Sequence, residues 1–93
     1  MRRIIIAGPA WADLERLETW LADRDAPYAK ALGVTLRTAF NSLRDFPERG
    51  RISKISAMRE FVVPFRTWTY VISYRVRPDR VTIARIHHAL EDR

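Results

Sequence analysis

A chain of 93 residues with an apolar fraction of 47% can bury one modest core, and this composition argues against disorder. The absence of cysteine excludes disulfides, thiolate nucleophiles and cysteine-based metal sites. No apolar run approaches the ~20 residues that span a bilayer. The apolar run near the N-terminus is also shorter than the ~7–15 residues of a signal-peptide core. We therefore expect a single cytoplasmic domain over residues 1–93.

The formal net charge is +6, from 17 basic and 11 acidic residues, and its distribution is uneven. Residues 11–25 carry five acids and two bases, whereas residues 44–93 carry eleven bases and six acids. A positive field of this kind attracts a phosphate backbone or an acidic protein. A GC-rich genome, which encodes Arg where another encodes Lys, would explain the many arginines without any anionic partner, so both explanations stay open.

The first half of the chain predicts a strand followed by a helical hairpin. Three consecutive isoleucines within Arg2–Ala7 are typical of a buried strand. Gly8 and Pro9 end that strand, and Pro9 suits the first turn of a helix. A leucine stripe at helical spacing predicts a helix from 9 to 24, with Asp13 on an exposed face.

A second helix is predicted from 26 to 45, because apolar residues step along it by three or four positions. We expect Gly33, which weakens a helix interior, to mark a close approach of the first helix. Phe46 and Pro47 end this helix, because the residue before a proline disfavours the α region. A polar loop is expected over residues 47–57.

Three β-rich runs follow, over residues 58–63, 68–76 and 81–88, and they predict an antiparallel meander. The turn Arg77–Arg80 contains Pro and Asp at positions that favour a tight hairpin. If Val76 faces Val81, Tyr74 pairs with Ile83. The same register pairs Ile72 with Arg85, Tyr70 with His87 and Thr69 with His88.

The expected fold class is therefore α+β, in the order β-α-α-β-β-β, with the helical hairpin on one face of a mainly antiparallel four-stranded sheet. The core is expected to contain these residues: Ile5, Leu14, Leu17, Leu21, Leu32, Leu36, Phe40, Leu43, Ile72 and Tyr74.

Metal chemistry has little support in this sequence, and we predict no metal and no cofactor. His87 and His88 are adjacent on a strand and point to opposite faces, so they cannot chelate one ion. The predicted register instead gathers a cluster on the less apolar face, with Arg59 and Arg66 nearby: Thr69, Ser73, Arg75 and His88. A histidine among arginines can perform acid–base chemistry on a phosphodiester. A structural histidine at a strand end, among solvated arginines, is the simpler interpretation.

The sequence resembles the RelE/ParE superfamily of bacterial toxins from type II toxin–antitoxin modules. The residues that carry the resemblance follow in chain order over nearly the whole chain: Pro9–Leu14, Phe46–Arg51, Met58–Pro64, Tyr70–Val76 and Ala84–Asp92. No single motif is specific, whereas their order and spacing together are.

The resemblance implies one of two activities. RelE-like toxins cut messenger RNA on the ribosome with basic residues on the middle strands and after the last strand, whereas ParE-like toxins poison DNA gyrase and lack that set. An ungapped superposition of the sequence on the RelE pattern places Val62, Pro64, Val71 and Glu91 at the basic positions. A carboxylate beside a phosphate repels it, so this departure argues against RelE-type cleavage.

The resemblance therefore favours a ParE-like toxin without catalytic residues, which binds DNA gyrase and is neutralised by an acidic antitoxin. Such antitoxins fold an extended, partly helical segment onto the toxin. The expected partner-binding residues are Arg59, Arg66, Trp68, Arg75, Arg85 and His88. The alternative is a ribosome-dependent mRNA endoribonuclease of the RelE type, which would act on the ribosome and mRNA with His88, Arg75 and Arg59.

Overall fold

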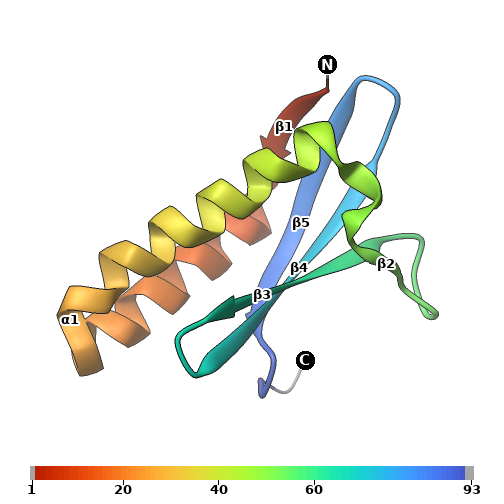
Figure 1. Ribbon diagram of the computed structural model, residues 1–93. Coiled ribbons are helices and arrows are strands. Elements are labelled where there is room, and N and C mark those ends of the chain that lie inside the picture. Colours follow the sequence, from red (N-terminus) through yellow and green to blue (C-terminus); the bar gives the residue numbers. More distant parts are fainter. Residues whose placement is uncertain (1, 92–93) are drawn as a thin grey trace.

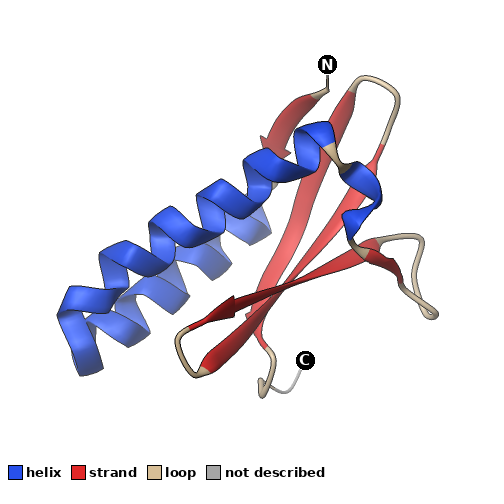
Figure 2. Ribbon diagram, in the orientation of Figure 1, coloured by secondary structure: helices blue, strands red, loops and turns tan. Residues whose placement is uncertain are grey.

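The computed structural model describes residues 2–91 and has the expected α+β architecture (Figure 1). In chain order its elements are β1 (Arg3–Ile6), α1 (Gly8–Asp45), the 3-10 turn η1 (Pro47–Arg49), β2 (Arg51–Ile52), β3 (Arg59–Phe65), β4 (Trp68–Val76) and β5 (Arg80–His88). The helix layer covers one face of the sheet (Figure 2). The sheet has five strands, one more than predicted, because β2 adds a two-residue pairing with β3. That pairing is too short to leave a recognisable pattern in residues 47–57.

Helix α1 is folded back on itself at Asp25, whose backbone is extended (φ −155°, ψ 72°). The two arms run side by side and form the predicted helical hairpin (Figure 1). The predicted close approach at Gly33 is confirmed, because a Cβ there would lie 3.0 Å from the carboxylate of Glu18 on the first arm. The nearest atom, Arg37 Nη1 at 2.7 Å, and the Glu18 carboxylate are both ends of flexible side chains, so these side chains would have to move to admit a Cβ at Gly33.

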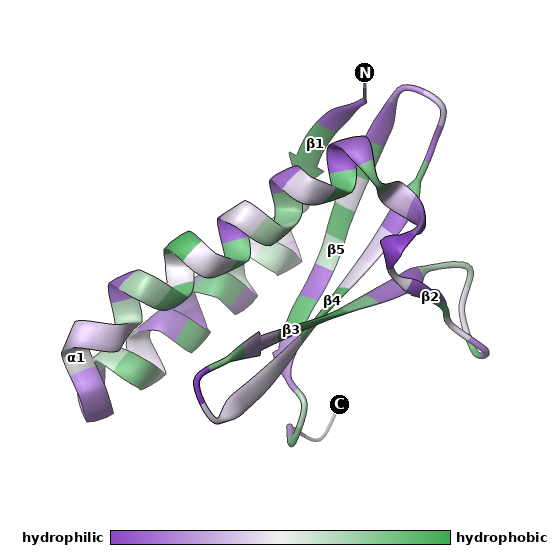
Figure 3. Ribbon diagram, viewed as in Figure 1, coloured by the Kyte–Doolittle hydropathy of each residue, from purple (hydrophilic) through white to green (hydrophobic). Residues whose placement is uncertain are grey.

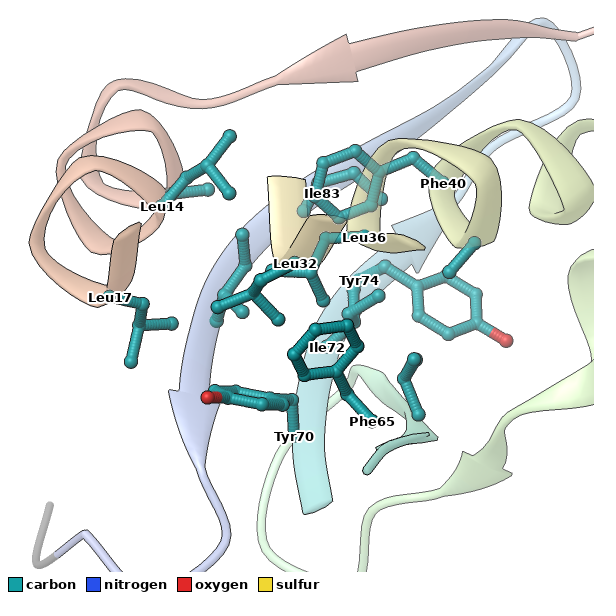
Figure 4. Close-up of a cluster of buried hydrophobic side chains, with 14 of the residues drawn as sticks. Leu14, Leu17, Leu32, Leu36, Phe40, Phe65, Tyr70, Ile72, Tyr74 and Ile83 are labelled. Carbon is teal, nitrogen blue, oxygen red and sulfur yellow. The ribbon is translucent and has the colours of Figure 1, made fainter. Parts of the chain in front are cut away.

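The strand order is β1-β5-β4-β3-β2, with β1 parallel to β5 and every other pair antiparallel. The helix-facing side of this sheet and the leucine stripes of α1 form the core (Figure 4). The predicted core is confirmed except at Ile5, where the prediction is wrong. Side chains alternate along a strand, so Ile4 and Ile6 pack against the core while Ile5 is 36% exposed on the opposite face.

The register of β4 and β5 matches the prediction only near the hairpin turn. Tyr74 pairs with Ile83 as expected, but the register then shifts, so that Ser73 pairs with Arg85. Ala84 is the extra residue of a β-bulge, a single insertion that leaves two residues on one strand opposite one on the other. The predicted pairs beyond the bulge are wrong by one residue, and the true partner of His88 is Tyr70.

Candidate functional site

The bulge in β5 is held by a buried carboxylate from α1. Asp13 Oδ2 accepts hydrogen bonds from the backbone amide of Ile86 at 2.9 Å and from Arg85 Nε at 2.8 Å, and Oδ1 accepts from Arg85 Nη2 at 3.1 Å. Strand β1 ends at Ile6, short of this part of β5. Asp13 therefore satisfies an edge amide of β5 where a neighbouring strand would otherwise be needed.

The expectation that Asp13 lies on an exposed face is wrong, because the residue is only 4% exposed. Its position in the sequence contained a signal. Asp13 lies three residues after Ala10 and four before Leu17, both of which are buried on the apolar stripe of α1. An acid on such a stripe needs a buried partner, but the sequence does not say which residue provides it.

Two opposing effects act on the Asp13 carboxyl. Burial raises its pKa, while the hydrogen bonds and positive charge of Arg85, the Ile86 amide and Arg16 lower it. The lowering effects prevail, and the pKa of Asp13 lies below the ordinary aspartate value. Arg85 is consequently engaged within the molecule, although its side chain is 58% exposed.

His88 lies at the end of β5 on the helix-facing side of the sheet. Its ring meets Tyr70 edge-on, with centroids 5.2 Å apart, and its Nδ1 accepts a hydrogen bond from the amide of Leu90 at 3.1 Å. Its own amide donates to Glu91 Oε1 at 2.7 Å, and the other carboxylate oxygen of Glu91 pairs with Arg16. These contacts fix the turn after β5 against the first arm of α1.

A groove of about 370 Å³ opens beside His88. We call it the aromatic groove, and its principal lining residues are Leu17, Trp20, Trp68, Tyr70, His88 and Leu90. Trp20 and Trp68 form its wall in an edge-to-face pair with ring centroids 6.2 Å apart. Trp20 is 45% exposed and Leu90 is 89% exposed, so the groove offers apolar surface to a partner.

The register shift prevents the predicted cluster of His88 with Thr69, Ser73 and Arg75. His88 lies on the helix-facing side, whereas those three side chains alternate onto the other, open face. The histidine of the open face is His87, which lines a hollow of about 770 Å³ with Ser73, Arg85 and Glu60 among its neighbours. The prediction that His87 and His88 point to opposite faces of the sheet is confirmed, but each lies on the face that was predicted for the other.

Arg59 lies beside Tyr74 and belongs to a separate hydrogen-bonded group. Its Nη1 donates to the carbonyl of Gly50 at 2.8 Å. The Tyr74 hydroxyl donates to the carbonyl of Pro47 at 2.6 Å and accepts from the amide of Gly50 at 2.8 Å. Burial is the main cause that raises the pKa of Tyr74, so its hydroxyl stays protonated. Figure 4 shows this hydroxyl pointing out of the core, away from that of Tyr70.

The remaining predicted partner-binding residues are distributed over the surface. Arg66 occupies the turn between β3 and β4 with a positive φ of 57°, and its guanidinium lies 3.6 Å from the ring centroid of Tyr28. Arg75 is exposed on the open face opposite Thr82. The structure thus brings Trp68 and His88 together in the aromatic groove, but places Arg75 on the other side of the sheet.

Within residues 2–91, no three His, Asp or Glu side chains come together as ligands for a metal ion. The same residues contain no helix with the length and apolar character needed to cross a membrane. Asp92, part of the motif Ala84–Asp92, lies outside the described residues.

Comparison with known proteins agrees with this fold. Residues 4–93 match the family model of the ParE toxin of the type II toxin–antitoxin system parDE. Toxin RelE1 and toxin RelE3 of Caulobacter vibrioides are similar to the chain at 40% and 41% identity; the first alignment covers 97% of this chain and 96% of RelE1, and the second covers both chains fully. A solved structure titled as the chromosomal ParDE system of P. aeruginosa shares the fold, with a TM-score of 0.78 and 20% identity over 95% of this chain and 96% of that one. The chain therefore belongs to the ParE/RelE family of toxins of type II toxin–antitoxin systems.

Proposed function

We propose that this toxin inhibits DNA gyrase by binding it, and that it does not cleave RNA. The observation that carries the proposal is the apolar part of the open sheet face around Val62, Pro64 and Val71. Val62 and Val71 pair across β3 and β4, and Pro64 lies two residues along β3. RelE-like toxins have basic residues at these positions, whereas here all three side chains are apolar; Val62 is 43% exposed and Pro64 is exposed, while Val71 is only 7% exposed. Such a surface cannot hold a phosphate by charge, but it suits a protein partner.

Glu91 supports the same proposal. The RelE pattern requires a base at this position, and here a carboxylate is bonded to Arg16 and to the amide of His88. A phosphodiester near this turn would meet an ion pair of Glu91 with Arg16 instead of the free base that the RelE pattern requires. The turn therefore has a structural role, and releasing Glu91 for catalysis would free the end of β5.

The RelE names of the Caulobacter relatives keep ribosome-dependent RNA cleavage as the second candidate. The hollow of the open face, with His87, Glu60 and Arg85, gives this candidate a specific location. The deciding residue is then His87 and not His88, because only His87 lines that hollow. An acid–base histidine normally contributes ~10²–10⁴-fold to a rate.

Two purified assays separate the candidates: supercoiling by DNA gyrase, and cleavage of messenger RNA in a reconstituted translation system. We expect the wild type to inhibit supercoiling and to leave the message intact. His87→Gln should keep this inhibition, provided that its unfolding midpoint matches the wild type. Ribosome-dependent cleavage that disappears in His87→Gln but persists in His88→Gln would overturn the gyrase proposal.

We further propose that the antitoxin occupies the aromatic groove. An exposed tryptophan pair is a suitable anchor for an apolar helix of the partner. Arg66 lies in the turn that precedes Trp68, and its charge would attract an acidic segment. Arg16 also lines the groove, but it is paired with Glu91. Trp20→Ala should weaken the complex by tenfold or more, a typical loss for an anchor residue.

Trp11 provides a matched control, because it is 49% exposed on the same arm of α1 but lies outside the groove. Trp11→Ala should leave the affinity close to that of the wild type. Titration calorimetry with the purified antitoxin measures both constants. Equal losses in the two variants would show that the groove has no special part in the complex.

A further inference from the structure

Arginine is concentrated at the end of the sheet where β4 turns into β5 and where β1 begins. Five arginines and one acid, Asp79, gather at this end, which we call the arginine tip: Arg2, Arg3, Arg75, Arg77 and Arg80. These residues account for four of the six net positive charges of the chain. Figure 3 shows hydrophilic residues at the beginnings of β1 and β5.

The backbone aligns several of these side chains on one face. Arg3 lies directly beside Arg80 in the parallel pair of β1 and β5, and Arg75 lies opposite Thr82. Arg75, Arg77, Arg80 and Thr82 line one hollow of about 380 Å³ on the open face. The strand alternation that exposes Ile5 therefore also directs these cations to one side of the sheet.

Only part of this positive charge is compensated within the described residues. Asp79 accepts a hydrogen bond from Arg80 Nη1 at 2.9 Å, and it lies 3.8 Å from Arg3 Nη2. The Arg77 side chain makes no hydrogen bond or ion pair with residues 2–91, and Arg75 is likewise exposed. Like charges on neighbouring strands repel each other, so an anion bound in this hollow would reduce the repulsion between the arginines.

We propose that the arginine tip binds the phosphodiester backbone of a nucleic acid. Guanidinium groups bind phosphate through paired hydrogen bonds, and hydroxyls such as that of Thr82 commonly add a further contact. The hollow has no aromatic anchor, in contrast to the aromatic groove. Protein partners generally need such an anchor, whereas a phosphate backbone needs only cations and hydrogen-bond donors.

This site is separate from the aromatic groove. The groove lies at Trp68, where β4 begins, and the tip lies beyond Val76, where β4 ends. Nine residues of strand separate them by roughly 26 Å. The inference goes beyond gyrase inhibition, because binding of a protein target does not itself require contact with a nucleic acid.

Fluorescence anisotropy of a labelled duplex DNA and of a single-stranded RNA, each of about 20 nucleotides per strand, tests the proposal at salt concentrations from about 50 to 200 mM. The variant Arg75→Gln/Arg77→Gln/Arg80→Gln removes the lining cations. The control Arg24→Gln/Lys30→Gln/Arg37→Gln removes the same charge from exposed positions on α1. Melting curves establish that both variants fold.

We expect the wild type to bind, with an affinity that falls steeply as salt rises. The tip variant should bind at least about tenfold more weakly at low salt. Its slope of log affinity against log salt concentration should be smaller in magnitude by about 2 to 3, because each lost phosphate contact removes roughly 0.9 from that slope. The control variant should keep the wild-type slope. Preference for DNA or for RNA identifies the source of the backbone, and either preference supports the proposal.

The single variant Arg77→Gln keeps the test decisive if the triple variant fails to fold, and its slope should fall by about one. Absence of wild-type binding at the lowest salt would overturn the proposal. Equal losses of affinity in the tip and control variants would also overturn it. So would polyglutamate, if it competed with the labelled nucleic acid as effectively, per charge, as unlabelled DNA does. No gyrase is present in the assay, so its outcome is independent of gyrase inhibition.

Discussion

Removal of the Asp13 carboxylate should weaken the fold through one buried backbone amide. In Asp13→Ala the amide of Ile86, bonded at 2.9 Å in the wild type, loses its acceptor at a site without access to an alternative strand. An unsatisfied buried donor costs ~1–3 kcal/mol. The lost bonds to Arg85 add less to the loss of unfolding free energy than those of a buried ion pair would. The Arg85 side chain is 58% exposed, so water can replace the carboxylate as its partner. The expected loss of unfolding free energy is ~2–4 kcal/mol.

Denaturant unfolding measures this loss, with two comparison variants. Asp13→Asn keeps an oxygen that can accept from the Ile86 amide, so it should cost less than Asp13→Ala. Glu15→Ala removes an exposed acid from the same arm and should stay within ~0.5 kcal/mol of the wild type. If Asp13→Ala also stayed within ~0.5 kcal/mol, the argument that this carboxylate replaces a strand would be refuted.

The pH dependence provides a second measurement of the same contact. The pKa of Asp13 is lower in the folded protein than the ordinary value of 3.8, so its stabilisation is complete above that value. It is lost as the pH falls through the lower folded-state pKa. The stability difference between the wild type and Asp13→Asn should therefore shrink between about pH 5 and pH 2. A difference that grew on acidification would contradict the sign of the shift.

Three further substitutions, with Val34→Ala as a control, test the core and the loop after α1 by denaturant unfolding. Tyr74→Phe removes both hydrogen bonds of the hydroxyl and should cost ~1–3 kcal/mol; no loss would mean that water replaces them. Gly50→Ala should also destabilise, because a Cβ would lie 2.5 Å from that hydroxyl, and Tyr74→Phe should partly relieve its effect. Leu36→Ala, at a fully buried position, should cost ~2–5 kcal/mol, whereas Val34→Ala, at a position 58% exposed, should cost much less. Equal costs at these two positions would contradict the assigned faces of α1.

Local patterns predicted the elements well because each pattern has a local cause. The leucine stripes reflect the pitch of a helix, and Arg77–Arg80 has the residues of a tight turn, so both arms of α1 and the hairpin lie where expected. The break at Asp25 likewise falls at the predicted connection. Each of these features follows from the sequence and from the geometry of a single helix or turn.

The bulge at Ala84 could not be predicted in this way because its cause is tertiary. Nothing in residues 80–88 distinguishes a regular strand from one with an extra residue. The distinguishing contact is with Asp13, more than seventy positions away in the chain. The same single-residue shift decides which of the two histidines faces the helices. The location of the candidate site therefore depends on the contact with Asp13, which the local pattern of β5 does not reveal.

The parallel pairing of β1 with β5 has a consequence for the synthesis of this toxin. Arg3 pairs with Arg80, so the first strand emerges from the ribosome long before its partner. At ~5–20 residues per second the delay is roughly 4 to 15 s. During that interval Asp13 also lacks Arg85 and Ile86, so the sheet edge and the helical hairpin cannot be locked together. A nascent chain that stops before β5 therefore lacks the contacts that assemble the toxin, and the complete fold arises only near the end of translation of these residues.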